Sequence, residues 1–300
     1  MNGLALSRDF YEEYGKPLLT ERFPELLDRI SVGLLGAGSE VLGYDDALSE
    51  DHDFTPDFCI FLPGEDVISR REAFLLERGY NSLPKEYKGV KRAVLSPAGG
   101  ARRGVLRLSD FLTEKLGVPD GELTIEQWLQ IPSQYLLEVT GGELFYDGSG
   151  EFSAIREKLA CYPEDVRKKR LAGHLVMMAQ AGTYNVFRCL AHKEPAAAQL
   201  AVTEFVTEAL ESFFLLENRY LPYYKWRFRA LRDTGYRDAE PELSDLLNGG
   251  AFRYTEEELK ARIQHIFERI TDEDPGKYAY GINDSIRDPY IRNLHILYCV

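Results

Sequence analysis

The chain has 300 residues, of which 44% are hydrophobic and 28% charged, and its formal net charge is −13 at pH 7. This composition is typical of a globular protein with a substantial core, organised as two domains or one large one. The acidic balance makes nucleic acid an unlikely partner, because neutralising phosphates requires a basic surface, but it allows a small anionic substrate such as a nucleotide bridged by a divalent metal.

Membrane insertion and secretion are not expected. No stretch reaches the roughly 20 consecutive apolar residues that a membrane-spanning helix needs, and the acidic N-terminal stretch does not read as a signal peptide. The four cysteines are widely spaced and form no CxxC pair, which argues against a disulfide framework or a structural zinc site. Together these features predict a cytoplasmic protein.

Mixed strands and helices are predicted through about residue 145. Apolar residues recur at helical spacing in the first segment, a short apolar run then leads into a tight turn, and a second apolar run is stopped by Pro63. A helix with Ser69 as its N-cap follows, and then two strand-like runs around a Gly-rich bend. The predicted helices are 9–30 and 69–80. Residues 31–39 are predicted as a strand that leads into a tight turn, and further strands are predicted over 57–63, 93–97 and 102–112.

The second half reads as helical. From residue 151 onward the apolar residues keep a helical period, and prolines and glycines divide the stretch into units of helix length. The Gly-rich turn before this change marks a domain boundary. We therefore predict an α+β chain: a mixed sheet with helices over residues 1–148, followed by an α-helical domain over residues 149–300.

A cluster of acids follows the first predicted strand. If residues 51–53 are extended, Asp51 and Asp53 project from the same face, because strand side chains alternate with period two. Two adjacent carboxylates form a ligand pair that suits Mg²⁺, which favours carboxylates together with substrate phosphates. Upstream, the turn at Gly38 and Ser39 can bring backbone N–H groups and a hydroxyl against a phosphate. These parts would clamp a nucleoside triphosphate for in-line attack at phosphorus.

The sequence LLGAGS followed by SEDHD resembles the nucleotidyltransferase superfamily that includes DNA polymerase beta and the aminoglycoside nucleotidyltransferases. The longer stretches GSEVLGYDDALSEDHDF, LFYDGSGEFSAIREKLACYPEDV and FLLENRYLPYYKWRFRALR resemble a bacterial nucleotidyltransferase-like family that carries a domain of unknown function. The resemblance implies a nucleotidyltransferase-type sheet domain with a helical domain as the other wall of a cleft. It implies phosphate contacts at Gly38 and Ser39, and catalytic metal binding at Asp51 and Asp53 by one Mg²⁺ or by a two-metal site.

The third carboxylate of active superfamily members has no evident counterpart. The strand in which it is expected, 102–112, offers no acid before Asp110 at its end. Either Asp110 or Glu138 substitutes, or a base comes from the helical domain, or the chemistry is lost. The other two acids of the cluster, Asp45 and Asp46, are predicted to form a turn or a helix cap.

A basic and aromatic stretch in the second half is the other unusual feature. Residues 214–232 gather five basic side chains against one acid, interleaved with tyrosines, a tryptophan and phenylalanines. Such a mixture can stack on a base and pair with phosphates, with Lys225 as the best candidate. The alternative is a core helix–turn–helix whose aromatics pack while the arginines pair with acids such as Glu208 and Glu211. Arg188 is a second candidate nucleotide contact, with a structural role as its alternative.

The leading hypothesis is a Mg²⁺-dependent nucleotidyltransferase that transfers a nucleoside monophosphate from a nucleoside triphosphate to a hydroxyl of a small molecule. One rival is a catalytically inactive nucleotide- or protein-binding module of the same fold, motivated by the missing third carboxylate. Another is a transferase that modifies a macromolecule. The sequence leaves open the nucleotide, the acceptor and the oligomeric state.

Overall fold

A computed structural model describes residues 2–46, 54–92, 103–250 and 253–300. The chain folds into two compact units. Unit 1 comprises Met1–Leu123 and Tyr135–Ala160, and unit 2 comprises Thr124–Gln134 and Cys161–Val300. The domain boundary predicted between residues 148 and 149 stays a prediction.

Unit 1 is built on a four-stranded sheet in the order β5-β2-β1-β6. Strand β1 runs antiparallel to both β2 and β6, whereas β2 and β5 run parallel. A separate two-stranded ladder joins β3 to β4. The strands are β1 (Ser31–Leu34), β2 (Cys59–Leu62), β3 (Glu86–Tyr87), β4 (Val90–Lys91), β5 (Gly104–Arg107) and β6 (Glu143–Asp147).

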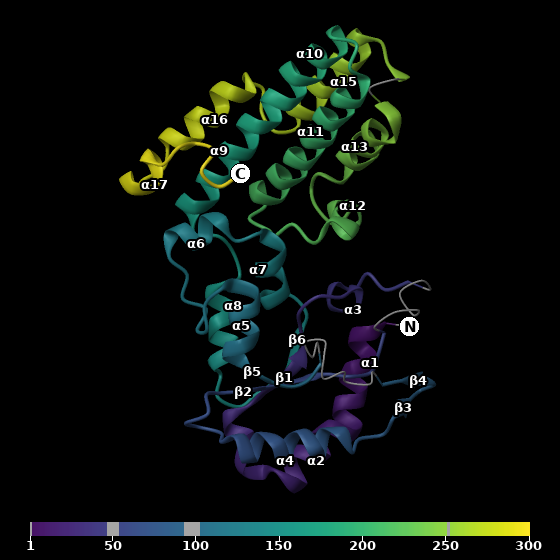
Figure 1. Cartoon of the computed structure of the whole chain (residues 1–300), viewed down its shortest axis with the longest axis vertical. Helices are drawn as coiled ribbons and strands as arrows, with labels where there is room; N and C mark the ends of the chain where they lie inside the picture. The colour runs from purple at the N-terminus through teal and green to yellow at the C-terminus, as the bar shows by residue number, and fades with distance from the viewer. Residues whose placement is uncertain (1, 47–53, 93–102, 251–252) are drawn as a thin grey trace. The chain divides into compact units, whose positions relative to one another are not determined.

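Helices cover both faces of this sheet (Figure 1). Along β2, Ile60 and Leu62 belong to the core formed with the N-terminal helices and α4. Phe61, which points to the opposite face, packs against Phe111 of α5 and Phe152 of α8. The helices are α1 (Gly3–Phe10), α2 (Lys16–Arg22), α3 (Ser39–Leu42), α4 (Arg70–Asn81), α5 (Leu108–Leu116), α7 (Ser133–Thr140) and α8 (Glu151–Lys158), with a π-helical turn at Tyr11–Gly15 and a 3₁₀ segment at Pro24–Arg29.

Most predicted elements of unit 1 are found, with three corrections, and the strand-like run predicted at 93–97 lies outside the described residues. The apolar runs form β1 and β2, and Ser69 caps α4 through a reciprocal capping box with Glu72. The strand predicted over 102–112 ends at Arg107, because the following apolar residues are buried at helical spacing along α5. Strand β6 has no counterpart among the predicted elements, since it is a short run between Gly-rich turns. The predicted first helix, 9–30, begins earlier, at Gly3, and α2 ends at Arg22, because Phe23 leaves the helical conformation and a 3₁₀ segment follows.

All described secondary structure of unit 2 is helical, so the mixed sheet followed by helices confirms the predicted fold class. The longest helix, α11, packs along α9, and α16 lies along the other side of α9 (Figure 1). The helices are α6 (Ile125–Gln130), α9 (Glu164–Ala179), α10 (Val186–Ala191), α11 (Pro195–Leu216), α12 (Arg227–Leu231), α13 (Glu240–Asp245), α15 (Glu256–Glu268), α16 (Pro275–Asp284) and α17 (Pro289–Asn293). Shorter π and 3₁₀ segments are Gln180–Asn185, Tyr224–Trp226, Arg237–Ala239 and Leu246–Gly250.

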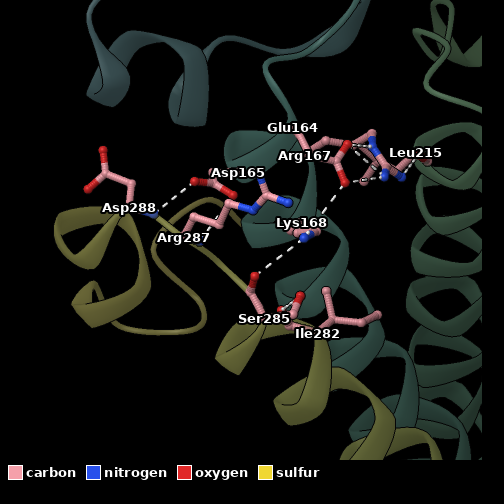
Figure 2. A network of polar contacts seen from close by, with 9 residues as sticks. All are labelled: Glu164, Asp165, Arg167, Lys168, Leu215, Ile282, Ser285, Arg287 and Asp288. Carbon is pink, nitrogen blue, oxygen red and sulfur yellow. Dashed lines mark hydrogen bonds and ion pairs between the residues drawn. The ribbon is translucent and has the colours of Figure 1, made fainter.

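Polar contacts join the C-terminal segment, residues 283–294, to α9. The carboxylate of Asp165 accepts hydrogen bonds from the backbone N–H groups of Arg287 and Asp288, and Lys168 donates to the Ser285 carbonyl at 3.3 Å (Figure 2). Lys169 is fully buried. Its ammonium donates to Asn283 Oδ1 at 2.7 Å and to the carbonyls of Arg292 and Leu294 at 3.2 and 2.6 Å.

A buried pair joins α9 to α11. His174 Nδ1 lies 2.7 Å from Glu208 Oε2, and both side chains are nearly inaccessible to solvent. Among the described helices, none is long and apolar enough to cross a bilayer. All four cysteines are free thiols.

Candidate functional site

Three strand ends meet at one edge of the unit 1 sheet. Because β1 is antiparallel to β2 and β2 is parallel to β5, the C-terminal end of β1 lies beside the N-terminal ends of β2 and β5. Gly33 pairs with Cys59, and Cys59 pairs with Gly104. The turn that contains Gly38 and Ser39 follows β1 at this edge. Asp51 and Asp53, which precede β2 in the chain, lie outside the described residues.

Glycine is required at position 38. Its φ of +141° and ψ of 151° define a backbone conformation that residues with a Cβ rarely adopt. A Cβ built there would also lie 2.4 Å from both carboxylate oxygens of Glu40. Ser39 is half-buried and begins α3, and its carbonyl accepts a hydrogen bond from the Tyr44 N–H at 2.8 Å. The turn is therefore closely packed on the side that faces Glu40.

A buried ion pair lies behind this turn. Glu40 is 6% exposed and Arg103 is 7% exposed, and their charged groups pair directly. Arg103 Nη1 also donates to the Leu35 carbonyl at 3.1 Å, which fixes the chain between β1 and the turn. Burial lowers the pKa of Arg103, but the neighbouring Cys59 and Glu40 raise it by more than burial lowers it. The pKa therefore lies above its ordinary value, and the guanidinium stays charged.

Two further acids have structural roles: Asp45, which follows α3 in the chain, and Asp57, which precedes β2. Asp45 Oδ2 accepts a hydrogen bond from the Gly3 N–H at 2.8 Å, at the first residue of α1. This agrees with the predicted turn or cap role. Asp57 is buried and binds Arg92 at 2.6 Å and the Tyr80 hydroxyl at 2.9 Å, so it anchors the entry to β2.

A pocket of about 670 Å³ opens beside Leu35–Ala37, just before the Gly38 turn. Edge strand β5 and helices α5 and α7 supply its remaining walls. Its size falls within the range of small-molecule sites. Its charged lining residues are Arg103, Arg107, Lys115, Asp110, Glu114 and Glu138, and its apolar wall includes Leu35, Val105 and Phe111.

Glu138 lies where the pocket meets the turn. Its carbonyl accepts a hydrogen bond from the Gly36 N–H at 2.9 Å. Its carboxylate pairs with Lys115 at 2.8 Å, and Lys115 also lies 2.8 Å from Glu114. Burial pushes the pKa of Lys115 down, but these two carboxylates raise it above its ordinary value, so the ammonium stays charged.

Both candidates for the third carboxylate thus line one pocket. Asp110 is on α5, beyond the C-terminal end of β5, whereas Glu138 is hydrogen-bonded through its backbone to the loop that follows β1. Whether either approaches Asp51 and Asp53 lies outside the described residues. Within the described ranges no cluster of three or more His, Cys, Asp or Glu residues could hold a metal ion.

The predicted contacts from the second half belong to unit 2. Lys225 is exposed, with its ammonium 4.9 Å from the Trp226 ring, and Arg188 is exposed and lies over the Tyr184 ring at 5.6 Å. Their assignment as nucleotide contacts stays a prediction.

The basic and aromatic stretch combines features of both readings. Helix α11 ends at Leu216, and the chain reaches α12 through a connection that includes a 3₁₀ turn, so two helices flank the stretch. Tyr220 is buried against Tyr162, whereas Tyr223 and Tyr224 are exposed. Arg227 lies 3.8 Å from Glu211, as the core reading expects, while Glu208 pairs with His174 instead.

Sequence reasoning missed the residues that support the turn. Glu40 directly follows Gly38 and Ser39, but an acid beside a turn is usually solvated. Arg103 lies near the start of the predicted strand 102–112, between Arg102 and Gly104, and a basic residue at a strand end is usually solvated. The antiparallel pairing of β1 with β2 and the parallel pairing of β2 with β5 bring the two together.

Comparisons with known proteins return two descriptions. The family model of a domain of unknown function (DUF4037) matches residues 128–227, less than half of the chain. The chain is similar to a solved nucleotidyltransferase-like protein from Exiguobacterium sibiricum 255-15, with 11% identity, a TM-score of 0.39, and coverage of 92% of this chain and 80% of that one. No curated protein matches the chain. The family that the sequence motifs resemble carries both of these descriptions, nucleotidyltransferase-like and domain of unknown function.

Proposed function

We propose that this chain is a Mg²⁺-dependent nucleotidyltransferase that moves a nucleoside monophosphate from a nucleoside triphosphate to a hydroxyl of a small molecule. The observation that carries the proposal is the meeting of strand ends in unit 1. The turn with Gly38 and Ser39 lies at the sheet edge where β2 begins, and the chain enters β2 from Asp51 and Asp53. A pocket large enough for a small substrate opens beside that turn.

Residues around the turn have distinct roles in this reaction. Ser39 and the backbone of Gly38 bind phosphate, and Asp51 and Asp53 would hold Mg²⁺, which supplies neutralising charge to the triphosphate. Glu138 is the base that we assign, because it lines the pocket and its backbone is bonded to the loop next to the turn.

The proposed transfer forms one bond to phosphorus and breaks another. Glu138 takes the proton of the acceptor hydroxyl, and the oxygen forms a bond to the α-phosphorus. The bond from that phosphorus to the oxygen bridging to the β-phosphorus breaks, and pyrophosphate leaves with the electron pair. The acceptor then carries the nucleoside monophosphate.

A binding experiment tests the site. The four nucleoside triphosphates are screened by thermal shift with and without Mg²⁺, since a ligand that binds only the folded state raises its stability. We expect a Mg²⁺-dependent rise with at least one of them, and its loss in Asp51→Asn, Asp53→Asn. The matched control is Asp28→Asn, Asp66→Asn, which removes two exposed carboxylates elsewhere in unit 1. Unchanged binding in the first double variant would refute the site.

A second experiment tests the chemistry. A triphosphate labelled at the α-phosphate is incubated with the protein and a mixture of hydroxyl-bearing small molecules, and both label transfer and pyrophosphate release are measured. We expect Glu138→Gln to lower transfer while leaving Mg²⁺-dependent triphosphate binding intact.

The inactive binding module is favoured by one observation. Strand β5 contains no acid and follows directly after Arg103, where the superfamily resemblance leads one to expect a carboxylate. Triphosphate binding without label transfer to any acceptor would support this alternative.

A further inference from the structure

Two charges of opposite sign line the pocket without an ion partner among the described side chains. Arg107, the last residue of β5, donates from Nη1 to the neutral carbonyl of Pro63 at 2.6 Å. Asp110, in the first turn of α5, makes no ion pair with any described residue, Arg107 included. Both groups are therefore available to a ligand.

The other charges of the pocket are already matched. Arg103 pairs with Glu40, and Lys115 pairs with Glu138 and Glu114. The charged groups left to bind a ligand are therefore the Arg107 guanidinium and the Asp110 carboxylate.

The surroundings favour one ligand group at each of these two positions. Arg107 is half-buried, so a carboxylate in the pocket would meet a partly desolvated guanidinium that keeps N–H donors free beyond the one bound to Pro63. Asp110 is exposed in the first turn of α5, and Glu114, four residues along the same helix face, is already paired with Lys115. Asp110 is therefore the carboxylate of this wall that is left for an ammonium group of the ligand.

We infer that the pocket binds a small zwitterion, an amino-carboxylate whose carboxylate is held by Arg107 and whose ammonium is held by Asp110. The apolar wall at Val105 and Phe111 receives the carbon skeleton between or beside the two charges. A hydroxyl on that skeleton would be the acceptor of the nucleotidyl group. This last role rests on the proposed function, whereas binding of the zwitterion does not.

Matched ligands test the inference on the full chain, without triphosphate or Mg²⁺. The longer set is L-tyrosine, tyramine, which lacks the carboxylate, and 3-(4-hydroxyphenyl)propionate, which lacks the amine. The shorter set is L-serine, ethanolamine and 3-hydroxypropionate. Calorimetry measures each dissociation constant. In at least one set we expect the zwitterion to bind about tenfold or more tightly than either analogue, since each loses one charge-assisted contact.

Two variants give reciprocal readouts. In Asp110→Asn the analogue without the amine should bind as well as the zwitterion, and in Arg107→Met the analogue without the carboxylate should do so. Arg107→Lys keeps the positive charge and should retain part of the preference. The controls are Arg70→Met and Asp66→Asn, exposed residues of unit 1 away from the pocket lining. Circular dichroism melts establish that each variant is folded.

The outcomes separate this inference from the proposed function. If neither zwitterion binds better than its analogues, or if the preference survives both Arg107→Met and Asp110→Asn, the inference is wrong. If the zwitterion preference is found but no triphosphate binds with Mg²⁺, the proposed function fails and the binding site stands. If a triphosphate binds with Mg²⁺ but no zwitterion preference is found, the inference is wrong and the proposed function stands.

Discussion

The buried pair of Glu40 and Arg103 allows a quantitative prediction for Arg103→Met. The substitution leaves the Glu40 carboxylate, which is 6% exposed, without the charge that faces it. Removing one partner of a buried ion pair costs about 3–5 kcal/mol. The Leu35 carbonyl also loses the hydrogen bond that it accepts at 3.1 Å. We therefore expect a loss of about 4 kcal/mol in the free energy of unfolding of unit 1.

Urea denaturation followed by circular dichroism measures this loss. For a domain of about 150 residues, such a change lowers the melting temperature by roughly 10 °C. The double variant Glu40→Leu, Arg103→Met removes both charges, so its stability should return to within about 2 kcal/mol of the parent chain. The control Arg70→Met breaks an exposed pair with Glu65, and should change stability by less than about 1 kcal/mol.

Two outcomes would refute this prediction, each on a different ground. A loss of under about 1 kcal/mol in Arg103→Met would mean that the pair is not buried in solution. Strict additivity of Glu40→Leu and Arg103→Met in the double variant would mean that the two side chains do not interact, since contacting residues show coupling of about 0.5–3 kcal/mol.

Three further predictions concern other parts of the chain. Gly38→Ala should destabilise unit 1 by about 1–3 kcal/mol in urea, because its φ of +141° suits glycine alone, and an unchanged midpoint would contradict this. Lys169→Met leaves three acceptors of the C-terminal segment unpaired, so limited proteolysis should cut that segment faster than in the parent chain. Burial raises the pKa of Glu242, but hydrogen bonds from Arg269 and His265 lower it below its ordinary 4.5, so its stabilising contribution is present above pH 4.5 and is lost as the pH falls through the folded-state value. The stability difference between the parent chain and Glu242→Gln should therefore narrow in acid, and a difference independent of pH would refute the assignment.

Local pattern was sufficient for several elements. The apolar runs that form β1 and β2, the capping box at Ser69 and the helical period after residue 151 are properties of neighbouring residues, so the sequence predicts them directly. The run after Arg103 is harder to predict. Four residues of strand are followed immediately by a helix, and a short apolar run fits either period.

The candidate site likewise combines features that the sequence predicts with contacts that it does not. The sequence by itself determined the turn at Gly38 and Ser39 and the spacing to Asp51 and Asp53, because these are matters of residue type and order. Only the tertiary structure decided that Arg103 is buried against Glu40, and that Arg107 and Asp110 share a pocket with Glu138. Those contacts join residues distant in the chain through the parallel pairing of β2 with β5 and the packing of α7, and strand order leaves no periodic signal in the sequence.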